Sequence, residues 1–266
     1  FFPSVVFWSS GIIKESLAMA GLFILSGIYI SLLTDSKMQW WEWLLAILSV
    51  FVVWNLKYYW IAVFIPVVIT TLLIHFITKK TQLKVSLKIL LWIVSFLIIC
   101  FGVTLVHPNF YLENFLNVLV ENYHEFVRIS PPENVVHYQL EPTWLSVILN
   151  SPSALLAGFF RPFIWEASNV LQMMVAVENL VILILLVTSI MSLNAIGKSP
   201  YRVLIFSTVA YIVMLCLFLA LSTPNLGTLS RYKVGFLPFL VFVLLVDNVM
   251  LKWLKDKVNR TFTWIV

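Results

Sequence analysis

Charge and cysteine are scarce in this chain of 266 residues, and both scarcities exclude common classes of protein. Charged residues make up 11% of the sequence, less than half of the roughly 25% that is usual in soluble globular domains. The two cysteines, Cys100 and Cys216, both lie in apolar runs, so no disulfide framework is expected. A soluble globular domain and a small disulfide-stapled domain are therefore excluded.

The motifs of soluble enzymes are also missing. The sequence holds no Gly-rich phosphate loop, no pair of histidines at metal-ligand spacing and no nucleophile-elbow motif. Its four histidines, His75, His107, His124 and His137, are scattered along the chain, and we interpret them as structural or solvated. No metal site and no nucleic-acid partner are expected.

Apolar and aromatic residues are abundant instead, and they predict an integral membrane protein. Hydrophobic residues reach 61%, and the chain has 11 Trp and 21 Phe, which suits anchoring at lipid–water interfaces. Because a spanning helix needs about 20 mostly apolar residues, we predict an all-α fold, a polytopic transmembrane helical bundle of about seven spans. The predicted spans are roughly 16–33, 42–56, 58–77, 87–106, 174–192, 203–222 and 235–251. The second is short and is interrupted by Asn55 and Lys57, which predicts a broken helix or part of a tight hairpin.

The stretch between the fourth and fifth spans holds most of the polar character and predicts a cap. We divide the chain into 1–106 (four spans), 107–173 (the cap) and 174–266 (three spans and a tail). Within 110–128, apolar residues recur at three- and four-residue steps, which predicts an amphipathic helix. Ser130-Pro131-Pro132 ends this helix, because proline disfavours helix in the residue before it. A second short helix is predicted to start at Ser151-Pro152.

The distribution of lysine and arginine predicts the orientation. Eleven of the 17 cations fall on one side of the predicted bundle, in the loops and tail represented by Lys37, Lys79, Lys198 and Lys252. Cytoplasmic loops carry the excess of Lys and Arg. The 107–173 region is therefore expected outside the cytoplasm.

Five of the remaining cations are the candidate site residues: Lys14, Lys57, Arg161, Arg231 and Lys233. They lie at the outer ends of spans, where ionisable residues are costly and tend to be paired, snorkelled or functional. Lys14 could form an interfacial ion pair with Glu15, and Lys57 could snorkel in an aromatic belt. If the five converge, they would bind an anion such as a lipid phosphate or pyrophosphate.

At these same residues the chain resembles the GT-C glycosyltransferase superfamily of bacterial polytopic membrane proteins. The resemblance rests on FPSVVFWSSGIIKES, NLKYYWIAVFIPVV, FFRPFIWEASN and NLGTLSRYKVGFLPFL. It implies transfer of a sugar from a polyprenyl-phosphate carrier to a glycan, lipid or protein acceptor on the outer face of the bacterial cytoplasmic (inner) membrane. Arg161, Arg231, Lys233, Lys57 and Lys14 would then bind the lipid phosphate.

The superfamily's usual general base is an aspartate in the first outer loop, and no residue here matches it. Because the chain begins at Phe1 inside an apolar stretch, we expect that aspartate in N-terminal residues that are missing. Glu15 and Glu166 are the fallback candidates for acid–base or metal work, and the outer glutamates permit a divalent cation without requiring one.

Two other function classes stay open. A polysaccharide polymerase of the O-antigen type, or a lipid-carrier flippase, would use the same anion-binding boundary, although the dry spans count against a flippase. The second class is non-enzymatic: an accessory subunit of a membrane complex. An outer-loop aspartate after a first span would favour the transferase.

Overall fold

In the computed structural model the protein is helical throughout the described residues, which are 2–11, 13–81, 83–105, 108–192, 199 and 201–262. The helices are α1 (Pro3–Ser10), α2 (Lys14–Leu33), α3 (Trp40–Thr78), α4 (Val85–Val103), η1 (Pro108–Phe110), α5 (Leu112–Ile129), η2 (Pro132–Asn134), α6 (Trp144–Phe160), η3 (Ile164–Glu166), α7 (Val170–Ile190), α9 (Arg202–Ser222), α10 (Leu226–Tyr232), η4 (Lys233–Gly235), α11 (Leu237–Leu245) and α12 (Val249–Phe262). The β-structure of these residues is limited to one isolated bridge, between Val135 and Asn225.

Several of these helices are long and apolar enough to cross a membrane. Five described helices meet that test, namely α2, α3, α4, α7 and α9, and the bent pair formed by 226–235 and 237–245 would be a sixth. Their outward faces carry large exposed apolar side chains, for example Phe51 on α3 and Ile98 on α4. Contiguous apolar surface of this kind is what a protein presents to lipid.

Helix α3 is folded back on itself at Lys57. As one straight rod its 39 residues would be about 58 Å long. Lys57 instead has non-helical torsion angles (φ −148°, ψ 62°) and contacts Glu15 at the start of α2, while Lys79, just after α3, pairs with Asp35 at the far end of α2. Residues 40–56 and 58–78 are therefore antiparallel arms, which corresponds to the tight hairpin of the two predicted alternatives.

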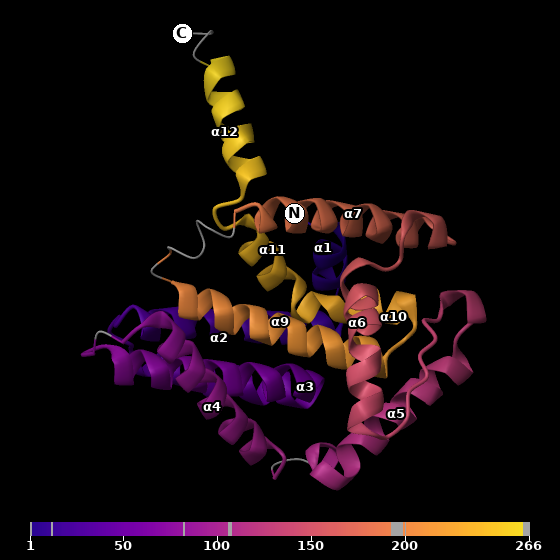
Figure 1. Ribbon diagram of the computed structural model, residues 1–266, viewed down its shortest axis with the longest axis horizontal. Helices are drawn as coiled ribbons and strands as arrows, with labels where there is room; N and C mark the ends of the chain where they lie inside the picture. The colour runs from indigo at the N-terminus through magenta and orange to yellow at the C-terminus, as the bar shows by residue number, and fades with distance from the viewer. Residues whose placement is uncertain are drawn as a thin grey trace.

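We name the two ends of the bundle after the acidic residues at the two ends of α2. The Glu15 end holds Glu15 and Lys57, and the Asp35 end holds Asp35 and Lys79. A hydrogen bond from the Lys79 ammonium holds the pKa of the exposed Asp35 carboxyl below its usual value. Figure 1 shows α2, α3 and α9 running side by side, with α5 and α6 gathered at the Glu15 end.

The helix predicted over 110–128 is α5, and it ends at Ile129 before the Ser130-Pro131-Pro132 sequence. Its buried face includes Leu116, Leu119 and Tyr123. The Tyr123 hydroxyl donates to the Tyr138 carbonyl (2.9 Å) and accepts from the Tyr138 N–H (2.8 Å), which fixes the chain that follows the helix. The amphipathic pattern therefore predicted both the helix and the face that packs.

Two helix boundaries predicted from the sequence were wrong. The second helix of the cap begins at Trp144 and not at Ser151-Pro152, because the Thr143 hydroxyl caps it by accepting from the Ser146 N–H (3.2 Å). Pro152 lies inside α6, where it removes one backbone hydrogen bond from a helix held against α9 by packing.

The last predicted span, 235–251, is interrupted. Helix α11 ends at Leu245, and a corner at 246–248 separates it from α12. Asp247 there adopts a left-handed conformation (φ 53°), which a continuous helix does not allow. Val106 and His107, at the predicted junction of fourth span and cap, and Lys198 lie outside the described residues.

Candidate functional site

Glu15, Lys57 and Arg231 meet at one point, which we call the Glu15 cluster. The Glu15 Oε1 atom lies 2.7 Å from Lys57 Nζ and 3.0 Å from Arg231 Nε. Glu15 and Lys57 are 1% and 5% exposed, so Lys57 does not snorkel to the surface. The Arg231 side chain is 39% exposed and can therefore also reach a ligand.

Local structure explains why these three side chains converge. Glu15 is in the first turn of α2, where the helix dipole favours a carboxylate. Lys57 is the turning point of α3, and Arg231 is in the last turn of α10. Three segments far apart in the sequence thus contribute one charge each.

Aromatic rings surround the two cations. Lys57 Nζ lies 3.8 Å from the centroid of the Tyr232 ring and 5.8 Å from that of Tyr59. Arg231 Cζ lies 5.8 Å from the Trp8 ring and 5.4 Å from the Tyr232 ring. Rings in these positions stabilise the cations through cation–π attraction in a dry environment.

The Glu15 cluster carries an excess of positive charge. Lys14 is exposed beside Glu15 at the start of α2, and it has no ion pair among the described residues. Glu15 therefore bonds to Lys57 and Arg231 and not to its chain neighbour. One carboxylate is paired with two cations, which leaves one formal positive charge in the cluster for an anion, and Lys14 adds another next to it in the chain.

Lys233 and Arg161 belong to a second group, the Lys233 cluster. Lys233 is 2% exposed, and its ammonium donates to the Arg161 carbonyl (2.7 Å) and to Asn179 Oδ1 (3.4 Å). The Arg161 guanidinium pairs with Glu166, with Nε 3.0 Å from Oε2. Four of the five predicted cations thus fall into two clusters, Lys57 with Arg231 and Lys233 with Arg161, and Lys14 bonds to neither.

The sequence prediction missed a buried carboxylate in this second cluster. Glu178 of α7 is 4% exposed and accepts hydrogen bonds from the N–H and the hydroxyl of Ser4 in α1. The next residue, Asn179, donates to the Pro162 carbonyl (3.1 Å). The signal for Glu178 in the sequence is an ionisable residue inside an apolar run.

An apolar cavity of about 400 Å³ adjoins the Glu15 cluster. It lies between the second arm of α3, the end of α4, the inner face of α5 and the end of α9, and its lining includes Tyr58, Tyr59, Phe115, Trp144, Phe218 and Tyr232. Tyr59 and Tyr232 thus flank Lys57 and also line the cavity. The buried Tyr59 hydroxyl has no hydrogen-bond partner among the described residues. The volume is within the usual range for small-ligand sites.

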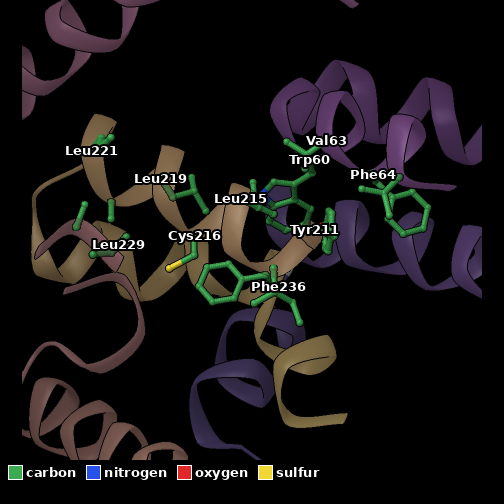
Figure 2. Close-up of a cluster of buried hydrophobic side chains, with 14 of the residues drawn as sticks. Trp60, Val63, Phe64, Tyr211, Leu215, Cys216, Leu219, Leu221, Leu229 and Phe236 are labelled. Atoms are coloured by element: carbon green, nitrogen blue, oxygen red, sulfur yellow. The ribbon is translucent and has the colours of Figure 1, made fainter. Parts of the chain in front are cut away.

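The core directly behind the site fixes the position of the α10–η4 segment (Figure 2). Trp60 of α3, Tyr211 of α9 and Phe236 are each no more than 1% exposed. The Tyr211 hydroxyl donates to the Gly235 carbonyl (2.9 Å). A Cβ at Gly235 would lie 2.7 Å from Nε1 and 2.8 Å from Cζ2 of the Trp60 indole, so only glycine fits there.

We therefore expect Gly235→Ala to destabilise the protein by about 1–3 kcal/mol, the usual cost of overpacking a core. Gly27→Ala is the matched control, because no atom lies within 4 Å of a Cβ at that position. The measurement is the free energy of unfolding in mixed micelles. Equal stability of the two variants would show that the indole moves aside.

The described residues contain no group of three or more His, Cys, Asp and Glu side chains able to hold a metal ion. Each carboxylate of the two clusters already has partners: Glu15 bonds to two cations, Glu166 to Arg161, and Glu178 to Ser4. What the arrangement offers chemically is therefore binding of an anion next to an apolar cavity. Comparisons of the chain with known protein families, with curated proteins and with solved structures found no match.

Proposed function

We propose that the protein is an integral membrane glycosyltransferase that takes a sugar from a polyprenyl-phosphate carrier and passes it to an acceptor on the extracytoplasmic face, in bacterial cell-surface glycan assembly. The observation that carries the proposal is the contact between the Glu15 cluster and the apolar cavity, through Tyr59 and Tyr232. A lipid phosphate has both halves that this arrangement fits: an anionic head and an apolar chain.

The proposed topology has seven spans. Counting the two arms of α3 separately and the bent pair 226–245 once gives that number. Lys79, Lys80, Lys84 and Lys88 then lie at the Asp35 end, which we assign to the cytoplasm by the positive-inside rule. The Glu15 end and the 107–173 cap face the opposite side of the inner membrane.

In the proposed reaction, the acceptor hydroxyl attacks the anomeric carbon while the bond from that carbon to the carrier phosphate breaks, and the proton of the hydroxyl passes to the released phosphate monoester. Lys57 and Arg231 stabilise the charge on the departing phosphate, because cations fixed in a dry site need no reorganisation during the reaction. Arg161 and Lys233 hold the turn at 161–166 in place, because the Lys233 ammonium donates to the Arg161 carbonyl and the Arg161 guanidinium pairs with Glu166. The carboxylates of both clusters receive structural roles.

An Arg231→Ala variant tests the proposal. Purified protein in nanodiscs is given a polyprenyl-phosphate-linked sugar with a membrane acceptor fraction, and release of polyprenyl phosphate is measured. We expect release by the intact chain and about a tenfold loss in the variant, since a charge-assisted hydrogen bond contributes about 1.5–3 kcal/mol. Arg128→Ala is the matched control, because Arg128 is an exposed arginine paired with Glu125 on α5.

Each carboxylate of the two clusters already has a partner. This favours one alternative, an accessory subunit that binds the carrier while another chain supplies the general base. Binding of polyprenyl phosphate without turnover would support that role. If neither binding nor release occurs, both functions are excluded. A polysaccharide polymerase would be recognised by growth of the glycan on the carrier.

A further inference from the structure

A corner fixed by buried polar contacts joins α11 to α12. Asn248 is 1% exposed, and its Nδ2 atom lies 2.9 Å from the Leu244 carbonyl, 3.2 Å from the Leu185 carbonyl and 3.0 Å from Thr188 Oγ1. Leu185 and Thr188 belong to α7. The corner is thus attached to the spanning bundle by its own side chain.

The first residues of α12 are held in the same way. The Met250 N–H donates to Asn248 Oδ1 (2.9 Å), and the Val249 N–H donates to the Ser192 hydroxyl (3.1 Å). Asp247, in the left-handed conformation that makes the turn, pairs with Lys252 (2.9 Å). The start and the direction of α12 are therefore set by the structure around them.

This corner turns α12 across the direction of the spanning helices. Figure 1 shows α12 leaving the body transverse to α7 and α9. It departs from the C-terminal part of α7. The next described helix, α9, starts at the Asp35 end, because its Phe206 packs on Trp92 of α4, a helix that begins just after Lys79. If α7 and α9 cross the bilayer, α12 lies in its plane at the Asp35 end.

The residues of α12 suit that position. At about 100° per residue, Lys252, Lys255 and Asp256 share one side of the helix, and the other side is apolar apart from Lys257. Val249, Trp253 and Leu254 are exposed, and none of the described residues covers them. The Lys257 ammonium lies 5.1 Å from the centroid of the Trp253 ring, as a lysine does when it reaches out from an apolar side.

We propose that α12 is an interfacial helix that inserts its apolar side into the leaflet at the Asp35 end, where Lys252, Lys255 and Lys257 bind anionic lipid headgroups. Basic amphipathic helices with Trp and Leu on the apolar side bind anionic membrane surfaces in this way. Charge complementarity selects the occupant, because the three lysines outnumber Asp256 and Asp247, the partner of Lys252, and leave an excess of positive charge. This site is separate from the Glu15 cluster and independent of the proposed function.

The test is amide hydrogen exchange of 249–257 in the full chain, in nanodiscs of phosphatidylcholine alone or with about a third of phosphatidylglycerol. We expect exchange about fivefold slower or more with the anionic lipid, which corresponds to an attraction of about 1 kcal/mol for one net positive charge near the surface. High salt should abolish the difference, because the Debye length falls from about 10 Å at 0.1 M to about 3 Å at 1 M.

Charge reversal separates this site from general attraction to the surface. In the variant K252E/K255E/K257E the effect of anionic lipid should disappear, whereas K80E/K84E/K88E, with the same change of charge at the same end, should keep it. Unchanged exchange in α9 shows that each variant is folded. Equal exchange in the two lipids, or equal loss in both variants, would overturn the proposal.

Discussion

Replacing Lys57 by methionine is expected to destabilise the protein by about 3 kcal/mol. Breaking a buried ion pair by removing one partner costs about 3–5 kcal/mol, because the other charge stays buried without it. We place the loss at the lower end because Arg231 keeps its 3.0 Å contact with Glu15. Lys57 also joins the two arms of α3, so we expect both arms of the hairpin to be destabilised.

The buried thiol of Cys216, which is 0% exposed, reports unfolding directly. In a Cys100→Ser background, its rate of modification across a denaturing-detergent titration gives the free energy of unfolding. Lys79→Met is the matched control, since its pair with Asp35 is about half-exposed and exposed pairs contribute about 1 kcal/mol or less. Equal losses in the two variants would contradict a special role for the buried pair.

A double variant separates the loss of a pair from the loss of a lysine. In Lys57→Met with Glu15→Gln the orphaned carboxylate is neutralised as well, and the half-exposed Arg231 can hydrate. We expect most of the stability lost in Lys57→Met to return. If the double variant is as unstable as the sum of the two single variants, Lys57 contributes through packing and not through charge.

The fold followed from the sequence where local pattern decides it. Apolar runs of spanning length predicted α2, α4, α7 and α9, and the three- and four-residue spacing predicted α5 with its buried face. The corner at Asp247 was missed because it depends on Asn248 reaching α7, a contact of 60 residues or more along the chain. The start of α6 was missed because the helix is capped earlier, by the Thr143 hydroxyl that accepts from the Ser146 N–H.

The candidate site was predicted only in its residue types. A cation at the end of a span is visible in the sequence, but its partner is not: Glu15 and Arg231 are 216 residues apart. The sequence therefore placed Lys14, Lys57, Arg161, Arg231 and Lys233 in one group, whereas the contacts divide the last four into two clusters and leave Lys14 outside both. Glu178 was passed over because it stands alone in an apolar run.

The second large effect is expected from Glu15→Gln, which removes the anion that competes with a ligand for Lys57 and Arg231. Glu15 now holds both cations and would repel a phosphate that approaches them. Two like charges about 6 Å apart repel by about 3 kcal/mol at an effective dielectric constant of about 20. We therefore expect the variant to bind polyprenyl phosphate about ten- to a hundredfold more tightly than the unmodified protein.

This increase distinguishes a ligand site from a structural ion cluster. The measurement is the dissociation constant for polyprenyl phosphate in nanodiscs, with protection of the Cys216 thiol as the check on folding. Glu166→Gln is the matched control, because that carboxylate pairs with Arg161 in the other cluster. A purely structural Glu15 cluster would give a less stable protein with unchanged or weaker binding, because nothing would then compete with Glu15 for its two cations. Tighter binding in Glu15→Gln alone would place the anion between Lys57 and Arg231, where the carboxylate now lies.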